Sequence, residues 1–458
     1  MKKQMALEGV RILAIEDFMA LPVGTQMLAD LGAEVIRLEA HTRPMQRGGG
    51  RFTVFPDNKP GKRFWNQGTA MVVFFRNKLS FTLELQMPKA LDIIKELVKK
   101  TDVVAQNFRP GAMKRMGIGY ESLRKIKPDI IYLSSSGYGE EGLWKGYGAY
   151  ARTIDAMCGT SIRCGYKDGG PTRANSSYFD STTGWTCANA ILMALHYRRR
   201  TGKGQYIDTS MYETAVTCVG EALMDYQMNG KLATRIGNQH PAWAPHGCYK
   251  CSGDDKWVTI AVRTDGEWKN LCDAMGNPVW VNDDKYADSL SRWTNQDTLD
   301  QKIGEWTSTR EHCEVTQLLQ SYGVPSGAVL NAKELLLDPH MKERNFFPRF
   351  EGTEDMREFG ARPVVGWSYK LSKTPPSIRF LDSLGEHNEY ILSQLLGKSR
   401  EEIAQLKEEG TIGDTPVIPK NWKPAPINNE NLKKAGDILD YDLKYREILG
   451  IESADKPK

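Results

Sequence analysis

The sequence predicts an α/β fold in which a mainly parallel sheet carries helices on both faces. Three observations lead to this prediction. Short runs of β-branched residues alternate with helical patterns over the first 135 residues. Prolines and glycines mark the ends of the helical patterns. Apolar residues make up 40% of the 458-residue chain, which is enough for sizeable cores. Alternation of this kind is typical of strand–helix–strand units.

The predicted elements follow one another closely. Strands are expected at residues 10–15, 34–38, 81–85, 103–106 and 130–134. A helix at 22–31 begins with Pro22 and stops at Gly32, and a second helix with one apolar face opens at Pro88.

Four later segments differ from this pattern. Residues 40–68 contain three consecutive glycines and no apolar periodicity, which predicts a long surface loop. Residues 182–199 predict a helix, and the composition then changes near residue 237 to a hairpin-like and later helical pattern, which predicts a smaller domain. The Pro- and Asn-rich residues 414–430 predict an extended tail over a partner surface.

Composition argues against several classes of function. The 61 Lys and Arg nearly balance the 57 Asp and Glu, so nucleic acid is not expected as a partner. The longest apolar runs fall well short of the about 18 to 20 residues that span a membrane, so no membrane is expected either. No export signal is visible at the N-terminus. The eight cysteines are scattered along a long chain, which favours free thiols in a reducing cytoplasm.

Common catalytic and ligand-binding motifs are weak or missing. Residues 137–142 (GYGEEG) match a dinucleotide-binding glycine pattern, but two glutamates stand where bare N–H groups are needed, so a structural turn is favoured. Cys248 and Cys251 lack a second pair at metal-ligand spacing, and no metal site is expected. The basic run at 198–200 closes a helix, which favours a solvated helix end over a phosphate site.

Asp180 is the candidate nucleophile. It lies just before the predicted helix at 182–199, where an aspartate is a favoured N-cap. The helix dipole and nearby N–H groups would keep this carboxylate ionised, and an ionised carboxylate can attack an activated acyl carbon. From position alone, a capping role and a catalytic role both remain open.

Five sequence blocks resemble the family III CoA-transferases. The hallmark block is YFDSTTGWTCANAILMALHYRRRTGKGQYIDTSMYETAV at 178–216, which includes Asp180. Four further blocks lie in the same order and spacing at residues 7–39, 77–85, 106–121 (QNFRPGAMKRMGIGYE) and 323–347. The resemblance covers most of the chain up to about residue 380.

The resemblance implies that the protein transfers coenzyme A from an acyl-CoA donor to a free carboxylic acid. The aspartate at position 180 would form an aspartyl anhydride and then an aspartyl-CoA thioester. No cofactor is implied beyond CoA itself, which acts as a co-substrate.

The resemblance also implies a set of site residues. Tyr150 matches a family tyrosine near the acyl site, thirty residues before Asp180. The positions that match the CoA-binding pattern are Phe18, Met19, Ala20, Leu83, Asn107, Phe108, Arg115 and Met116. Arg115 has a separate rationale, because a guanidinium binds phosphates bidentately. Basic residues of some members are replaced here by Ala40 and Gln86.

Two alternatives to a transferase remain open. The related α-methylacyl-CoA racemases have a histidine where this chain has Tyr150, because they need a base on each face of the substrate. A phenol with a pKa near ~10 is a poor base at neutral pH, which makes the racemase the second choice. The third reading is a CoA-binding protein without catalysis.

The family fold implies a large Rossmann-like domain built from both chain ends and a smaller α+β domain. The expected divisions are 1–215 for the first part of the large domain, 216–236 for a linker, 237–330 for the small domain, and 331–458 for the return linker, large-domain completion and tail. Each subunit would be an open ring, interlocked with a second ring in a homodimer.

Overall fold

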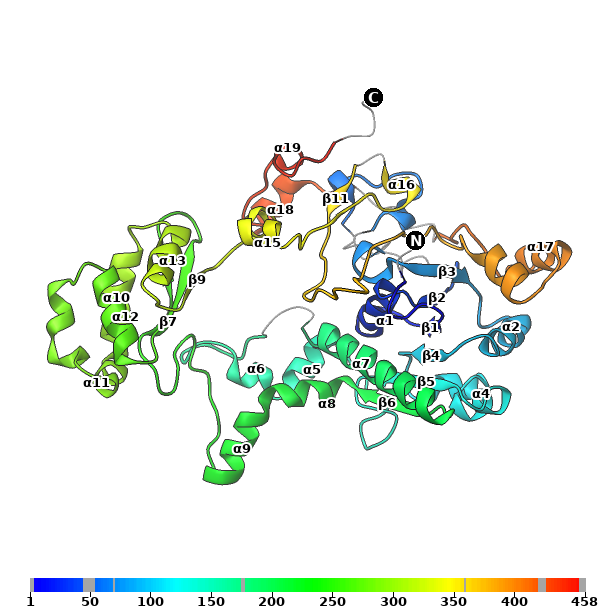
Figure 1. Ribbon diagram of the computed structural model, residues 1–458, viewed down its shortest axis with the longest axis horizontal. Helices are drawn as coiled ribbons and strands as arrows, with labels where there is room; N and C mark the ends of the chain where they lie inside the picture. Colours follow the sequence, from blue (N-terminus) through cyan, green and yellow to red (C-terminus); the bar gives the residue numbers. More distant parts are fainter. Residues whose placement is uncertain are drawn as a thin grey trace. The chain divides into compact units, whose positions relative to one another are not determined.

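A computed structural model describes residues 4–43, 54–68, 71–173, 178–357, 360–418 and 426–452. The chain divides into two compact units (Figure 1). The first comprises residues 1–159, 175–220 and 339–458, and the second comprises 160–174 and 221–338. The domain scheme drawn from the sequence, with divisions at 215, 236 and 330, stays a prediction.

The described residues of the first unit form a six-stranded sheet in which every neighbouring pair is parallel. In spatial order the strands are β3 (Lys78–Thr82), β2 (Glu34–Glu39), β1 (Arg11–Ile15), β4 (Val103–Gln106), β5 (Ile131–Ser136) and β6 (Tyr206–Ser210). This order, 3-2-1-4-5-6, is that of dinucleotide-binding sheets. The α/β prediction is confirmed. The strand expected at 81–85 is wrong in its bounds, because it begins at Lys78 and ends at Thr82.

Helices cover both faces of this sheet. One face packs against α1 (Ala20–Asp30) and α7 (Tyr178–Thr201). The other face packs against α2 (Pro88–Val98), α4 (Tyr120–Ile126) and, from the C-terminal part of the chain, η8 (Tyr390–Leu395) and α17 (Arg400–Glu408). The sheet core is therefore completed by residues from both ends of the sequence.

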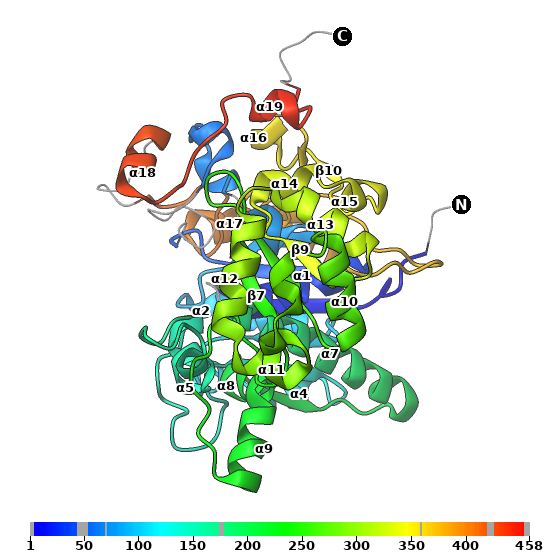
Figure 2. The ribbon, with the colours of Figure 1, turned by 90° about the vertical axis from the view of Figure 1, so that its left-hand side faces the viewer.

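The described part of the second unit holds a three-stranded antiparallel sheet of β7 (His246–Lys250), β8 (Trp257–Ala261) and β9 (Ser326–Ala328). Its core includes residues from α10 (Asp265–Ala274), α12 (Gln296–Thr307) and α13 (His312–Ser321), which lie beside the sheet in Figure 2. The hairpin expected near residue 250 is β7 and β8.

The remaining elements are short. They are η2 (Pro56–Asn58), η3 (Phe64–Asn66), η4 (Met71–Phe75), α3 (Ala112–Arg115), α5 (Ala151–Met157), α6 (Thr160–Arg163), α8 (Met211–Val216), η5 (Thr217–Val219), α9 (Gly220–Asn229), η6 (Val279–Asn282), η7 (Asp284–Tyr286), α11 (Ser289–Thr294), α14 (Ala332–Leu337), α15 (Pro339–Glu343), β10 (Arg349–Phe350), α16 (Glu354–Arg357), β11 (Arg362–Pro363), α18 (Asn429–Ala435) and α19 (Tyr445–Ile448).

The C-terminal tail contacts the loop that follows β2. Asp57 forms ion pairs with Arg362 at 2.9 Å and with Arg446 at 2.7 Å, and it accepts a hydrogen bond from Tyr445. Burial opposes ionisation of Asp57, but these three partners outweigh it and lower its pKa.

The predicted surface loop at 40–68 contains two short 3₁₀ turns, η2 and η3. Residues 44–53 of this loop lie outside the described part of the chain.

Two other expectations can be compared with the fold. The eight cysteines, all within the described part of the chain, form no disulfide. Among the described residues, no helix combines the length and the apolar character needed to cross a membrane. Of the tail predicted at 414–430, the described residues Val417 and Ile427 donate main-chain hydrogen bonds to His41 and Asn58 of the same chain.

Candidate active site

The carboxyl ends of β1 and β4 form the centre of the candidate site. These two strands are neighbours, but the chain after β1 turns to α1 on one face and the chain after β4 continues to α4 on the other. In parallel α/β sheets, ligands bind in the crevice that such a divergence opens. Phe18, Met19 and Ala20 follow β1, and Asn107 and Phe108 follow β4, so the fold brings these five predicted residues to one edge.

The turn between β1 and α1 is held in an unusual conformation. The side chain of Asn107 accepts a hydrogen bond from the main-chain N–H of Asp17 at 2.8 Å and donates one to its carbonyl at 2.7 Å. Phe18 has a φ of 57°, which is uncommon for a bulky residue, and its side chain is 63% exposed. An exposed aromatic ring held in this way is available to a ligand.

Tyr150 lies beside this turn. It is the N-cap residue of α5, and its ring meets the ring of Phe18 edge-on with 5.6 Å between centroids. The tyrosine side chain is 64% exposed. The structure therefore joins two predicted site residues that are far apart in the sequence, and it leaves both rings open to solvent.

Asp180 is placed near the same turn by a close approach of α1 and α7. A Cβ atom on Gly184 would lie 2.5 Å from the carbonyl oxygen of Ala20, and a Cβ on Gly24 would overlap the carbonyl of Gly184. Only glycines allow this contact. Gly184 lies one turn after Asp180, and Phe179 shares a small buried cluster with Ala20. The first turn of α7 is thus fixed against the first turn of α1.

The sequence prediction for Asp180 needs two corrections. The helix begins at Tyr178 rather than near residue 182, so Asp180 lies within the first turn instead of before it. Its pKa is also not kept low by the helix dipole. Burial, followed by repulsion from Asp155, raises the pKa of Asp180 to about 6. Burial disfavours the charged form of the carboxylate. At pH 7 the carboxylate is still about 90% ionised.

Asp155 was missed by sequence reasoning. It lies on α5, is 2% exposed, and stands 25 residues before Asp180 in the sequence. A lone acidic residue in a short helical segment gives no functional signal, so only the fold shows that its charge acts on the candidate nucleophile.

The other predicted CoA-binding residues are distributed along the same edge. Leu83 follows β3, but its side chain is buried in the sheet core, so only its main chain can meet a ligand. Arg115 ends α3 and is exposed, with no ion pair to any residue in the described ranges, while Met116 packs partly against the core. The guanidinium of Arg115 lies near Gly111, where an added Cβ would be 3.2 Å from Nη1.

The glycine pattern at 137–142 forms a structural turn, as the sequence favoured. The main-chain N–H of Glu140 donates to Asp208, and the carboxylate of Glu140 accepts a hydrogen bond from the N–H of Gly111 at 3.1 Å. No helix begins at Gly142. The N–H of Glu140 is already bonded to Asp208 and is therefore not offered to a phosphate.

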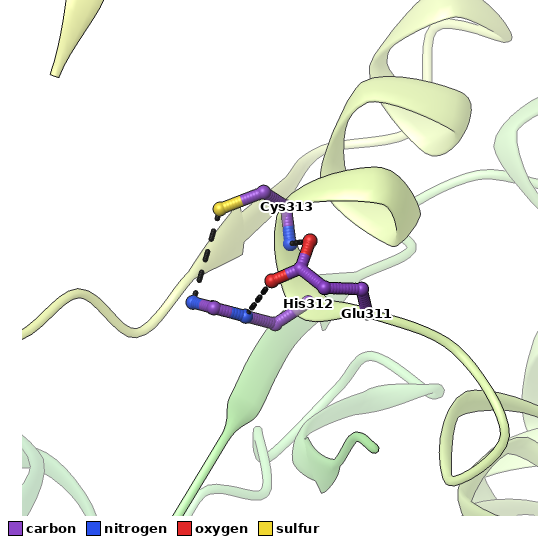
Figure 3. A group of neighbouring side chains, drawn as sticks. All are labelled: Glu311, His312 and Cys313. Carbon is purple, nitrogen blue, oxygen red and sulfur yellow. Dashed lines mark hydrogen bonds and ion pairs between the residues drawn. The ribbon is translucent and has the colours of Figure 1, made fainter. Parts of the chain in front are cut away.

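Within the described residues, one group of side chains lies close enough together to hold a metal ion. Candidate ligand atoms of Glu311, His312 and Cys313 lie within 4.8 Å of one another (Figure 3). These atoms already have partners. Glu311 caps α13 by accepting main-chain hydrogen bonds and also contacts Nδ1 of His312, whose Nε2 lies 3.3 Å from Glu334. Lys256 pairs with Glu334. These contacts are those of a capped helix with a buried polar cluster.

Other candidates from the sequence lie elsewhere. Cys248 and Cys251 are outside that group. Arg198 pairs with Asp102 at 2.7 Å, which favours a structural role for the basic run. The second unit contains a cavity of about 470 Å³ with Tyr166, His246 and Asp300 among its lining residues.

The strand order, together with the divergence of the chain to opposite faces after β1 and β4, defines an α/β protein of the dinucleotide-binding class. Comparison with known proteins narrows this class. Residues 7–388 match the model of the CoA-transferase family III. The chain is 33% identical to a succinyl-CoA–D-citramalate CoA-transferase of Chloroflexus aurantiacus over 89% of its own length and 98% of the relative. It is 32% identical to a formyl-CoA:oxalate CoA-transferase of Streptomyces coelicolor over 89% of its own length and 99% of the relative.

A solved structure agrees with these relatives. A CAIB/BAIF family protein from Brucella suis superposes with a TM-score of 0.76 at 28% identity, covering 86% of this chain and all of that one. The chain belongs to CoA-transferase family III. The protein is therefore a CoA-transferase enzyme that acts on CoA thioesters, as its resemblance to the family implied.

Proposed function

We propose that the protein transfers coenzyme A from an acyl-CoA to a free carboxylic acid, with Asp180 as the covalent nucleophile. The observation that carries this proposal is the position of Asp180. It is a partly buried carboxylate in the first turn of α7, and its neighbour Phe179 packs in one buried cluster with Ala20, which follows the exposed Phe18. The Phe18 ring in turn contacts Tyr150. A carboxylate with a pKa of about 6 is ionised at neutral pH and is a stronger base than an ordinary aspartate.

The exchange proceeds in four balanced steps. The Asp180 carboxylate attacks the donor thioester carbonyl, the C–S bond breaks, and a mixed anhydride and CoA thiolate form. The thiolate then attacks the aspartyl carbonyl, which releases the donor acid and leaves an aspartyl-CoA thioester. The acceptor carboxylate attacks this thioester to give a second anhydride and thiolate. Finally the thiolate attacks the acceptor acyl carbon and regenerates Asp180. No water is consumed, so the thioester energy is kept.

The residues around Asp180 have proposed roles in binding. Phe18, Met19 and Ala20 would contact the CoA thioester from one side of the crevice, and Asn107 and Phe108 from the other. Main-chain N–H groups at the start of α1 and α7 are suited to stabilise the oxyanion of each tetrahedral intermediate.

The outer residues have proposed roles as well. Arg115, exposed and without an ion pair among the described residues, would bind a CoA phosphate, with Met116 beside it. Leu83 would contribute through its main chain, and Tyr150 would line the acyl site.

We propose that the acceptor is a carboxylic acid, and the names of the protein's relatives indicate which acids to consider first. The names of two relatives include D-citramalate and oxalate, which are dicarboxylic acids. The sequence lacks the glycine-rich lid of oxalate-using members in residues 237–262, which disfavours oxalate. Trp185, which is exposed on α7 one turn after Asp180, favours an acid larger than formate, whereas Trp65 is buried in an apolar cluster. The first acids to test are therefore four- and five-carbon dicarboxylates, followed by aromatic acids.

A cytoplasmic, interlocked homodimer is proposed from the family resemblance. Helix α9 supports this assembly, since none of its residues is buried although it carries the apolar residues Leu223, Met224, Tyr226 and Met228. Sedimentation velocity that gave a single species of about 51.6 kDa would contradict the dimer.

Mass spectrometry tests the transfer. Purified protein is incubated with acyl-CoAs and acids, and both new thioesters and adducts on the 178–197 peptide are measured. We expect a new acyl-CoA only when an acid is present, and no product from Asp180→Asn. Asp92→Asn, at an exposed carboxylate on α2, is the control. Full transfer by Asp180→Asn would refute the nucleophile. Exchange of the α-proton with deuterium in the absence of an acid would instead support an isomerase.

A further inference from the structure

A fully buried lysine lies beneath the turn that carries Phe18. The side chain of Lys78, at the start of β3, is 1% exposed, and that of Glu16 is 0% exposed. The Lys78 ammonium is 2.5 Å from Glu16 Oε1, 2.7 Å from Thr25 Oγ1 and 2.9 Å from the carbonyl of Pro22. An ammonium has three donors, so all of them are used.

These three contacts join the two ends of the turn. Glu16 is the first residue after β1, whereas Pro22 and Thr25 belong to the first turns of α1. Thr25 also donates a hydrogen bond to the second carboxylate oxygen of Glu16 at 2.6 Å. One ammonium therefore fixes the distance between the strand end and the helix start, and with it the path of the residues between them.

The turn needs such support. A positive φ on a residue like Phe18 costs on the order of 1–3 kcal/mol and persists only where the surroundings impose it. Asn107 holds Asp17 from the β4 side. Lys78, from β3, holds the residues at the two ends of the turn, so contacts from strands on both sides of β1 support the residues around Phe18.

Stability alone does not explain a buried ion pair. Removing two charges from water costs free energy, and well-packed apolar residues often stabilise a protein as much. Burial lowers the pKa of Lys78 to about 8, although Glu16 opposes this shift, so the ammonium still predominates at pH 7. The chain thus keeps a charged group at a costly place, directly beneath the candidate CoA-binding turn.

We propose that Lys78, paired with Glu16, is a positioning residue that sets the conformation of the Phe18–Ala20 turn for the CoA thioester. This inference rests on the proposed function, because it assigns CoA binding to that turn. If the pair were removed and the binding conformation fell to a tenth of the population, the affinity for CoA would fall about ten-fold.

The test compares two buried ion pairs that lie near opposite ends of α1. Lys78→Met with Glu16→Gln removes both charges beneath the turn. Arg76→Met with Asp30→Asn removes a similar pair, 2.9 Å apart and 5% and 0% exposed, at the last residue of α1. The measurements are the Kd for CoA by calorimetry, kcat/KM for the acyl-CoA donor, and stability by urea unfolding.

We expect both double variants to lose stability, and only the first to raise the Kd for CoA and lower kcat/KM for the donor by at least ten-fold. Equal CoA affinity in the two double variants would overturn the inference. Lys78→Arg serves as a second variant that keeps the charge. A Kd within about three-fold of wild type in Lys78→Arg supports positioning by charge, and a Kd as poor as in the double variant contradicts it.

The outcomes also separate this inference from the proposed function. Wild-type protein that transfers CoA, with a variant that binds CoA normally, refutes the positioning role alone. Wild-type protein that binds CoA but transfers none refutes the proposed function, while the Kd comparison still decides the role of Lys78. Wild-type protein that fails to bind CoA overturns both.

Discussion

Acidification from pH 7 to pH 5 is expected to lower kcat/KM for the acyl-CoA donor about ten-fold, because a protonated carboxyl group does not attack a thioester. With a pKa of about 6, Asp180 is ionised in about 90% of molecules at pH 7 and in about 10% at pH 5. An aspartate with the ordinary pKa of 3.8 would remain more than about 90% ionised over the same range.

Asp155→Asn is expected to shift the fall of kcat/KM at acidic pH, the acid limb of the profile, to lower pH. Burial is the larger cause of the raised pKa and stays in the variant, whereas repulsion by Asp155 is removed. The pKa of Asp180 should therefore fall, but not to 3.8, and the variant should retain more of its pH 7 activity at pH 5 than the wild type does. Far-ultraviolet circular dichroism and urea unfolding confirm that the variant is folded.

The assay uses a donor whose acyl group does not titrate, such as propionyl-CoA. In a ping-pong mechanism, kcat/KM for the donor is independent of the acceptor acid. The 3′-phosphate of CoA ionises near pH ~6 as well, so a dephospho-CoA thioester serves as the control. A profile that is flat between pH 5 and 7, or an acid limb that vanishes with the phosphate, would refute the assignment. An acid limb at the same pH in Asp155→Asn as in the wild type would also refute the assignment.

Four further variants have expected outcomes. Gly184→Ala should destabilise the protein by about 1–3 kcal/mol, because the new Cβ meets the carbonyl of Ala20. Gly304→Ala, in open space on α12, should stabilise it by about 0.5–1 kcal/mol, and urea midpoints measure both. Asp180→Asn should abolish transfer yet raise stability at pH 7 by about 1–2 kcal/mol, since a partly buried charge is removed; an unchanged or lower Tm argues against the raised pKa. Asp57→Asn should cost about 1–2 kcal/mol at pH 7. Because the folded-state pKa of Asp57 is lowered, this difference should shrink as the pH falls below 3.8, and a pH-independent difference contradicts the ion-pair account.

Local patterns in the sequence located most of the sheet but misplaced one strand, for a physical reason. The run at 81–85 looks more like a strand than residues 78–80, because Lys78 and Ser80 are polar. In the fold these two side chains are buried and paired with Glu16 and Glu39. Partners more than forty residues away in sequence make the polar residues acceptable in a buried strand, and no local pattern reveals them.

In the candidate site, too, the sequence identified residues but did not predict how they are arranged. Asp180 was a candidate from its place before a predicted helix, and the resemblance to a family gave the expected roles of Asp180, Tyr150 and Phe18. Their arrangement depends on long-range contacts, namely the glycine contact of α1 with α7 and the ring contact of Phe18 with Tyr150. The helix position predicted a low pKa for Asp180, whereas the depth of its burial, a property of the whole fold, raises it.

The raised pKa of Asp180 is consistent with covalent catalysis. Burial disfavours the charged carboxylate of the resting enzyme, but it does not disfavour the neutral anhydride or thioester that replaces it. A shift from 3.8 to about 6 corresponds to at most about 3 kcal/mol before screening by solvent is allowed for, and the part that remains after screening would be released if Asp180 were acylated as proposed. In the proposed mechanism the free enzyme is therefore destabilised relative to its acylated forms, while about 90% of the Asp180 carboxylate remains ionised at pH 7. A more deeply buried aspartate would lose the ionised fraction, and a fully exposed one would lose the driving force for acylation.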